Sequence, residues 1–138
     1  GQNLTITKET RAKIWIERQI HRKDEEQYGQ LAIVEESSGN LIGLGGIIMR
    51  EMNDTIEYEV TYSLIPRYWG KGYATELAQH FCGYAEKHLQ INSVISMIHP
   101  ENGASIKVAE KNDMALDGAF FIFGMNVLVY RHVFSPKN

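Results

Sequence analysis

Apolar and polar residues alternate along residues 56–64 (I-E-Y-E-V-T-Y-S-L), which is the pattern of a half-buried β-strand. After a short turn, apolar residues recur at helical spacing along residues 74–89. These helical positions are Ala74, Leu77, Ala78, Phe81, Ala85 and Leu89. The pattern therefore predicts a strand that passes through a glycine-containing turn directly into a long helix.

The rest of the chain predicts one helix before this unit and one after it. Residues 7–23 match a capped helix in which isoleucines recur near the helical period, and residues 103–112 match a shorter helix. The remaining strands are expected at residues 31–36, 41–49, 93–98, 119–123 and 127–134. The order α-β-β-β-α-β-α-β-β predicts an α/β layered sheet of mixed strand direction, with residues 1–138 forming a single domain.

Composition and charge narrow the class of protein. Hydrophobic residues make up 43% and charged residues 22% of the chain, as in a globular domain. The formal net charge is −3 without a block of lysine or arginine, so no nucleic-acid partner is expected. The most apolar run, residues 119–130, is too short to span a bilayer, and no signal peptide is seen. We therefore expect a cytoplasmic protein with no membrane partner.

The turn before the long helix carries the candidate chemistry; it reads Arg67-Tyr68-Trp69-Gly70-Lys71-Gly72-Tyr73-Ala74. The first N–H groups of a helix are unpaired and carry partial positive charge, so they can bind phosphate oxygens. Gly70 and Gly72 let the backbone approach a ligand without a Cβ, while Arg67 and Lys71 add positive charge. The alternative is a tight strand–helix connection with glycines at strained dihedral angles.

Three segments, in order, resemble the GNAT acyl-CoA N-acyltransferase superfamily. Residues 67–74 resemble its pyrophosphate-binding motif, Gln/Arg-x-x-Gly-x-Gly/Ala. Residues 59–64 (E-V-T-Y-S-L) resemble the E-I-G-Y-x-L strand of the branch that acetylates the N-terminal alanine of ribosomal proteins. Residues 102–114 resemble the N-x-x-S-x-x-V-x-x-K-x-G-M segment of the same branch through Asn102, Ser105, Val108, Lys111 and Met114.

This resemblance implies a mixed, mostly antiparallel central sheet flanked by helices, and an enzyme that uses acetyl-CoA as co-substrate and no metal. It implies direct attack by a primary amine in a ternary complex, with a protein N-terminal α-amine favoured as acceptor. The lone Cys82 lies inside the predicted helix, which argues against a covalent intermediate. A small-molecule amine acceptor and a non-catalytic CoA-binding module are the alternatives. The residues expected to contact the cofactor are Arg67, Trp69, Gly70, Lys71, Gly72, Tyr73, Ala74 and Asn102.

Amine acylation needs a neutral amine, and Glu59 is the candidate base. A lysine amine has a pKa of about 10.4 and a peptide α-amine about 7.7–8.0, so a carboxylate must accept the proton directly or through water. Strand alternation puts Glu59 on one face with Glu57 and Thr61, and in the resembling branch this glutamate sits near the acceptor amine. Glu57 is the second candidate. The structural alternative is a solvated carboxylate opposite a cross-strand lysine or arginine.

The leaving thiolate has a conjugate acid with a pKa of about 8.5, and a nearby O–H donor eases its departure. Many family members use a tyrosine seven residues after the motif asparagine, but Ala109 stands there in this chain. In the resembling branch the serine three residues after the asparagine takes this place, which implies Ser105 as the general acid. Asn102 is expected to bind the pantetheine or to cap the helix. Without a chemical task, Ser105 would be a small first-turn residue.

The chain departs from the family pattern in three places. Thr61 replaces a glycine on a strand that family members bulge or splay to free a backbone N–H, and its β-branch disfavours the bulge. Asp113 replaces the glycine of K-x-G-M, and we expect it to keep the left-handed helix end. We expect the strand and helix with which complete family domains begin to be missing. Either the natural N-terminus is absent or a partner chain covers the bare sheet edge, which favours disorder or a homodimer.

Overall fold

The computed structural model describes residues 3–5, 14–18, 29–122 and 124–136. Its strands form a single eight-stranded sheet in the order β1-β2-β3-β4-β5-β6-β8-β7. The strands are β1 (Asn3–Thr5), β2 (Ile14–Arg18), β3 (Gly29–Glu35), β4 (Leu41–Met52), β5 (Thr55–Leu64), β6 (Ser93–Ile98), β7 (Ala115–Ile122) and β8 (Met125–Val133). The helices are α1 (Tyr73–His88), α2 (Gly103–Lys111) and the short 3-10 helix η1 (Pro66–Tyr68). This arrangement confirms the predicted mixed, mostly antiparallel sheet.

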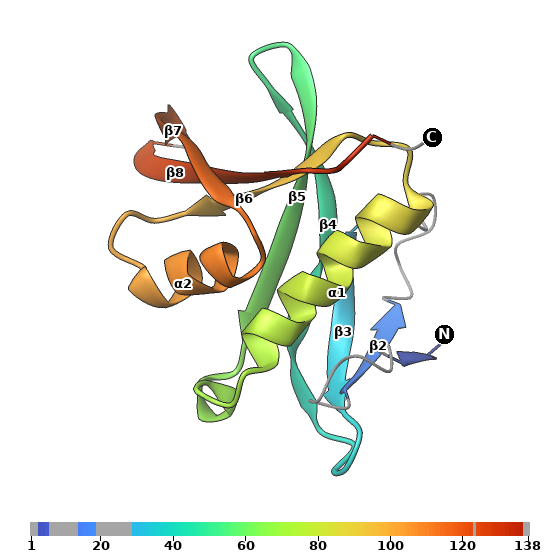
Figure 1. Ribbon diagram of the computed structural model, residues 1–138. Coiled ribbons are helices and arrows are strands. Elements are labelled where there is room, and N and C mark those ends of the chain that lie inside the picture. Colours follow the sequence, from blue (N-terminus) through green and yellow to red (C-terminus); the bar gives the residue numbers. More distant parts are fainter. Residues whose placement is uncertain (1–2, 6–13, 19–28, 123, 137–138) are drawn as a thin grey trace.

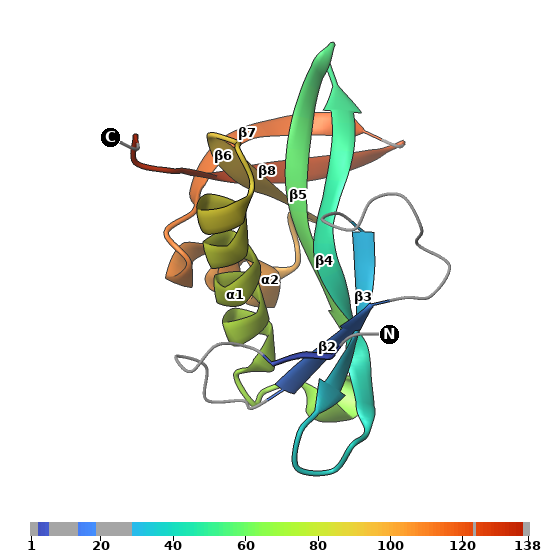
Figure 2. The same cartoon turned by 90° about the vertical axis from the view of Figure 1, so that its right-hand side faces the viewer.

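Helix α1 crosses one face of the sheet and contacts β4, β5, β6 and α2 (Figure 1). In the view turned by 90°, both helices stand on the same side of strands β3–β5 (Figure 2). The buried positions of α1 recur at spacings of three and four residues: Leu77, Ala78, Phe81, Cys82 and Ala85. They pack against sheet residues such as Ile33, Ile47, Val60 and Val94 to form the core. The amphipathic pattern therefore fixes which face of α1 is buried.

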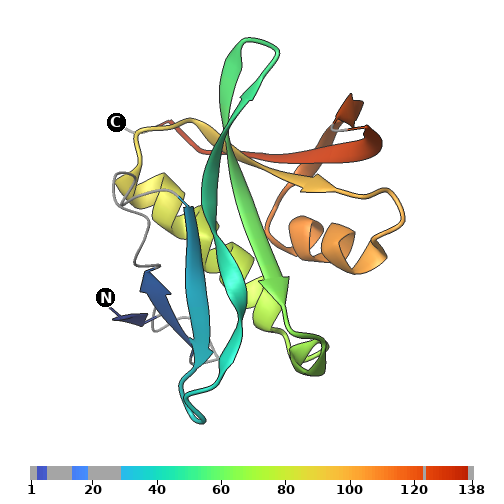
Figure 3. The ribbon, with the colours of Figure 1, turned by 180° about the vertical axis from the view of Figure 1, so that it is seen from behind.

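Strands β5 and β6 are the parallel pair of the described sheet, and they meet at a single register position, Glu59 opposite Ile95. Beyond this point they diverge, so that β3–β5 and β6–β8 form two arms of the sheet (Figures 1 and 3). The register between β4 and β5 is continuous, with Thr61 opposite Gly46. The splay that family members show is therefore present, while no bulge occurs at Thr61.

The turns follow from residues that tolerate left-handed backbone. Asn53 and Asp54 both have positive φ, 51° and 63°, as a two-residue hairpin between β4 and β5 requires. Asp113 has φ 62° directly after α2, and the Met114 N–H donates to the Ala109 carbonyl oxygen (3.0 Å). The helix end expected at Asp113 is therefore confirmed.

The N-terminal prediction is wrong where the structure can be compared with it. Residues 14–18 form β2, which pairs antiparallel with β3, rather than part of a helix over residues 7–23. Isoleucines at positions 14 and 16 fit the two-residue period of a strand, and pairing with β3 decides between the two periods. Residues 7–13 and 19–23 of the predicted helix lie outside the described residues. The expectation that no strand precedes this segment is also wrong, because β1 pairs with β2 and β3 is not a bare edge.

The C-terminal hairpin begins earlier than predicted. Strand β7 starts at Ala115 instead of residue 119, because Ala115 pairs with Arg131 and the ladder continues past an irregularity between Leu116 and Gly118. Gly118 and the bulge before it interrupt the alternation of apolar and polar residues by which a strand is predicted from sequence, so the prediction began only at residue 119. None of the helices in the described residues is long and apolar enough to cross a bilayer.

Candidate active site

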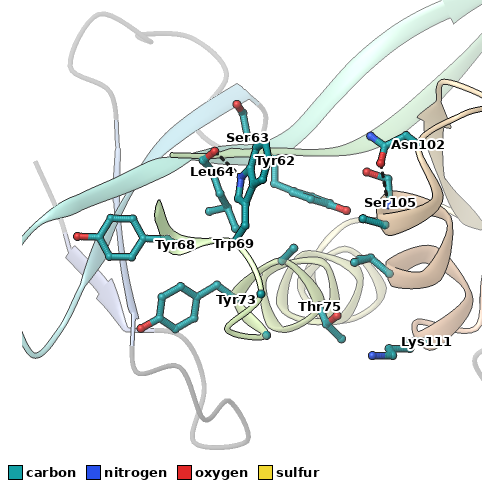
Figure 4. Close-up of a pocket in the computed structure, with 15 residues that line it drawn as sticks. Tyr62, Ser63, Leu64, Tyr68, Trp69, Tyr73, Thr75, Asn102, Ser105 and Lys111 are labelled. Atoms are coloured by element: carbon teal, nitrogen blue, oxygen red, sulfur yellow. Dashed lines mark hydrogen bonds between the residues drawn. The ribbon is translucent and has the colours of Figure 1, made fainter. Parts of the chain in front are cut away.

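A pocket of about 540 Å³ lies beside the C-terminal end of β5, between the start of α1 and helix α2 (Figure 4). Its walls are Tyr62, Ser63 and Leu64 of β5, residues 68–70 and 72 of the connection, Tyr73, Ala74 and Thr75 of α1, and Asn102, Ala104, Ser105, Val108 and Lys111 of α2. The pocket thus brings together the motifs at residues 59–64 and 67–74 with the motif at residues 102–114, which follows them by about thirty residues.

The glycine loop forms the turn into α1. Gly70 and Gly72 have φ values of 77° and 85°, and no atom lies within 4 Å of where a Cβ would stand at either position. Gly72 is the N-cap of α1, and no side chain caps this end. Helix α1 therefore starts at the pocket with N–H groups that no capping side chain satisfies, as phosphate binding requires. Trp69 is 65% exposed and fastens the loop by donating from Nε1 to the Leu64 carbonyl oxygen (2.9 Å).

The two cations of the loop are exposed and do not line the pocket itself. Arg67 Nη2 donates to the Tyr68 hydroxyl (3.1 Å), and its guanidinium lies 5.1 Å from the centroid of that ring. Lys71 stands between the two glycines, and both cations lower the pKa of Glu35 by their charge. Arg67 and Lys71 therefore add positive potential beside the glycine loop, but they do not form part of the pocket wall.

Tyr73 anchors the first turn of α1 to the end of β3. Its hydroxyl donates a hydrogen bond to the Glu35 carboxylate, which raises the pKa of Tyr73 to about 12. Hydrogen bonds from Tyr73 and Ser38 hold the pKa of Glu35 below its usual value, since they favour the charged carboxylate. Tyr73 therefore supports the loop with its hydroxyl and lines the pocket with the rest of the residue.

The backbone of Tyr62 faces the gap between the two arms. The Ile65 N–H donates to the Ile42 carbonyl oxygen (2.8 Å), so these residues form a hydrogen-bonded pair of the antiparallel ladder. Such pairs recur every second residue, so Ser63 and Thr61 also direct their backbone groups toward β4. Tyr62 directs its N–H and C=O the other way. Because β6 pairs with β5 only at Glu59, these groups face the splay beside the pocket.

Helix α2 places two polar residues on the opposite wall. Asn102 is its N-cap, and its Oδ1 accepts a hydrogen bond from the Ser105 N–H (3.1 Å; Figure 4). Asn102 therefore caps α2, which was one of the two roles expected from the sequence, and it also lines the pocket. Ser105 also lines the pocket, on the wall toward which the Tyr62 ring extends (Figure 4).

Tyr62 is the functional candidate that the sequence pattern did not single out. The strand alternation put it opposite Glu59, on the face that packs toward the helices, where an aromatic residue is usually core. In the structure it is half-buried, and its ring extends from β5 toward Ser105 (Figure 4). Burial raises the pKa of the Tyr62 phenol, and the hydrogen bond with Ser105 acts in the opposite direction. The only feature of the sequence that could have indicated a functional role for Tyr62 was its place in the E-V-T-Y-S-L motif.

Glu59 lies at the point where β5 and β6 part, and it is not among the residues that line the pocket. It is 7% exposed, and Arg50 Nε donates to its Oε1. The alternative to a catalytic role was a solvated carboxylate opposite a cross-strand lysine or arginine. The arginine partner is present, but the Glu59 carboxylate is buried instead of solvated. Glu59 is thus close in sequence to the pocket wall but on the other face of β5 from Tyr62.

Glu57 is engaged across the sheet. Both of its oxygens accept hydrogen bonds from the Arg131 guanidinium, at 2.9 and 2.8 Å. Arg131 also donates to Ser93 Oγ (2.8 Å) and to Asp117 Oδ2 (3.2 Å). Glu57 therefore connects β5 with β8, from one arm of the sheet to the other.

Comparison with known proteins relates this geometry to a family. The acetyltransferase (GNAT) domain model matches residues 4–115. The uncharacterized protein YkkB of Bacillus subtilis is 34% identical over 96 residues, which are 68% of this chain and 56% of that protein. The uncharacterized N-acetyltransferase p20 of Bacillus licheniformis is 29% identical over 94 residues, 68% of this chain and 52% of that protein. The chain thus spans about half the length of the curated relatives it matches.

Solved structures share the fold. An acetyltransferase from Agrobacterium tumefaciens matches with a TM-score of 0.65 and 30% identity, covering 76% of this chain and 60% of that one. The ribosomal-protein-S5-alanine acetyltransferase from Vibrio fischeri matches with a TM-score of 0.66 and 18% identity, covering 78% and 62%. The spermidine N-acetyltransferase SpeG from Vibrio cholerae, an N152L mutant, has a TM-score of 0.64 and 21% identity, covering 80% and 66%. At these last two identities the likeness concerns the fold alone.

Proposed function

Because the chain belongs to the GNAT acetyltransferase family, we propose that it transfers an acetyl group from acetyl-CoA to a primary amine. The observation that carries the proposal is the pocket at the splay of β5 and β6, which is walled by the glycine loop on one side and by α2 on the other. Direct attack in a ternary complex is favoured, because Cys82 is buried within α1 and burial raises the pKa of its thiol to about 12. Such a thiol is a poor nucleophile.

The glycine loop and the start of α1 are the proposed pyrophosphate site. Free N–H groups and the helix dipole favour negative charge at this end, and the glycines at positive φ leave room for the phosphates. Arg67 and Lys71 would attract the anion, while Trp69, Tyr73 and Ala74 would shape the wall. Asn102, already the cap of α2, is proposed to contact the pantetheine from the opposite side.

The splay supplies the proposed binding groups for the thioester. Pantetheine can pair with strand-like backbone only where a strand lacks its neighbour, and β5 lacks β6 beyond Glu59. The Tyr62 N–H, which points into this gap, is the proposed donor to the thioester oxygen as that oxygen gains charge. A fixed backbone donor needs no reorganisation during the reaction.

Glu59 is the proposed general base, and Ser105 is proposed to assist the departing thiolate. Glu59 would take the amine proton, directly or through a water, from its place at the apex of the splay. Ser105 would donate a hydrogen bond to the departing sulfur from the α2 wall. The attack forms a C–N bond and breaks the C–S bond, so the amine loses one proton and the sulfur gains one.

A protein N-terminal α-amine is the favoured acceptor, because its pKa of about 7.7–8.0 leaves more of it neutral than a polyamine or lysine amine at neutral pH. A small amine is the alternative. A peptide that begins with alanine and spermidine are suitable probes, with release of the CoA thiol as the readout. Faster release with the peptide supports the favoured acceptor, whereas faster release with spermidine overturns it.

The first test is calorimetric titration of acetyl-CoA into the wild-type chain and into the G72D and G72N variants. Asp and Asn have nearly the same size and both tolerate left-handed backbone, so they differ chiefly by one negative charge. We expect micromolar binding by the wild type, and at least about tenfold weaker binding by G72D than by G72N. A folded wild-type chain that binds no acetyl-CoA would exclude the transferase proposal for this chain.

A non-catalytic CoA-binding module is the second candidate, favoured by the engagement of Glu59 with Arg50 away from the pocket wall. Binding of acetyl-CoA with no thiol release above the hydrolysis rate, for any of a panel of amines and peptides, would select it. Binding with release would exclude it.

A further inference from the structure

Three tyrosines line the pocket, and two of them have hydroxyls that are already engaged outside it. The Tyr73 hydroxyl donates to Glu35, and the Tyr68 hydroxyl accepts from Arg67 (3.1 Å) and from Asn40 (3.4 Å). In the close-up, both of these hydroxyls point away from α2, whereas the Tyr62 ring extends toward it (Figure 4). Tyr62 is therefore the pocket tyrosine whose hydroxyl faces the side where Asn102 and Ser105 lie.

The Tyr62 ring extends toward Ser105, and both residues line the same pocket (Figure 4). Tyr62 is half-buried, and burial raises the pKa of its phenol despite the hydrogen bond with Ser105, so the phenol is protonated at neutral pH. Besides the three tyrosines, Lys111 is the titratable side chain that lines the described pocket, six residues beyond Ser105 along α2. The pocket thus presents a protonated phenol and an aliphatic alcohol on the side toward α2.

These two groups differ in what they can do for a departing thiolate. An aliphatic alcohol is a far weaker acid than a thiol, so a serine hydroxyl can donate a hydrogen bond to sulfur but is a poor source of a proton. A phenol, with an ordinary pKa of about 10, is much closer to the thiol value of about 8.5. Ala109 offers no hydroxyl at the position where many family members carry a tyrosine.

We propose that Tyr62 is the proton donor to the CoA sulfur, and that Ser105 holds the Tyr62 hydroxyl in position for it. When the C–S bond breaks, its electron pair goes to sulfur and the phenol proton follows, leaving a tyrosinate that water reprotonates. Tyr62 would then act twice, since its backbone N–H faces the thioester oxygen and its hydroxyl faces the sulfur. This inference rests on the proposed function.

The test measures how strongly the pocket stabilises the thiolate form of CoA, which needs no acceptor amine. Calorimetric affinities for CoA and for desulfo-CoA are compared at pH 7.5 and pH 9.5. A donor that lowers the pKa of the bound thiol by one unit, from about 8.5, raises the affinity ratio of CoA to desulfo-CoA about fivefold over this range. We expect this rise in the wild type and a rise of less than about twofold in Y62F.

Two further variants separate Tyr62 from its neighbours. Y73F removes another pocket tyrosine hydroxyl, and it should keep the rise because it affects both ligands alike. S105A removes the partner of Tyr62, and we expect an intermediate rise. An unchanged rise in Y62F, with the rise lost in S105A, would assign the role to Ser105 alone and overturn the proposal, as would a wild-type chain that binds both ligands with a constant ratio. A wild-type chain that binds neither ligand contradicts the proposed function itself, so the two failures are distinguishable.

Discussion

At the scale of single residues, the molecule uses side chains both as structural partners and as site groups. Asn102 caps α2 and lines the pocket, and Tyr73 anchors α1 through Glu35 while its other atoms form part of the wall. Sequence motifs predicted that these positions matter, but a motif cannot say which atom faces the ligand. For Glu59 the motif leaves the choice between a structural and a catalytic role open, because its carboxylate is buried against Arg50.

The role of Glu59 can be decided by comparing it with its neighbour on the same face. E59Q and E57Q each convert a carboxylate that is paired with an arginine into an amide. If Glu59 is the general base, E59Q lowers kcat about 10²–10⁴-fold with the amine probe, and E57Q lowers it far less. Thiol release under saturating acetyl-CoA measures both, with thermal unfolding as the check on folding. The reverse order would transfer the role to Glu57, and equal small losses would give both residues a structural task only.

At the scale of elements, the entry into α1 depends on backbone that glycine adopts easily. Gly72 has φ 85°, whereas Gly83 lies in the middle of the same helix. At neither position would a Cβ meet any atom within 4 Å, so substitution by alanine tests backbone conformation without a steric clash. The two glycines thus form a matched pair within one element.

We expect G72A and G83A to shift stability in opposite directions. Alanine at Gly72 must adopt left-handed backbone and should lower the free energy of unfolding by about 1–2 kcal/mol. Alanine at Gly83 takes ordinary helical backbone and should raise it by about 0.5–1 kcal/mol. Urea denaturation followed by circular dichroism measures both. A stabilising G72A would show that the turn does not need left-handed backbone in solution.

At the scale of the whole molecule, two arms of one sheet are held together where they cross. Strands β5 and β6 share a single register position, and the bridge from Glu57 to Arg131 spans the same junction. This bridge lets the strands part beyond Glu59 without separating the arms. The pocket therefore exists because the sheet is paired at one point and open beyond it.

Breaking this bridge from one side should destabilise the chain. R131M leaves the Glu57 carboxylate half-buried without its two charge-assisted hydrogen bonds, which should cost about 1.5–3 kcal/mol of unfolding free energy. Adding E57Q removes the unpaired charge and should recover at least half of the loss, as a double-mutant cycle would show. If the double variant is less stable than R131M, Glu57 has a second partner that matters more than Arg131.

Local pattern in the sequence determined α1, α2, strands β3–β6 and the helix end at Asp113, because the period of apolar residues and the tolerance of a residue for left-handed backbone act over a few positions. Ordered motifs also identified the family and most of the pocket wall. Tertiary structure alone decided that residues 14–18 pair as a strand with β3, that β5 parts from β6 after Glu59, and that the Tyr62 ring extends toward Ser105 in the pocket (Figure 4). Each of these depends on contacts between segments far apart along the chain, which no local periodicity records.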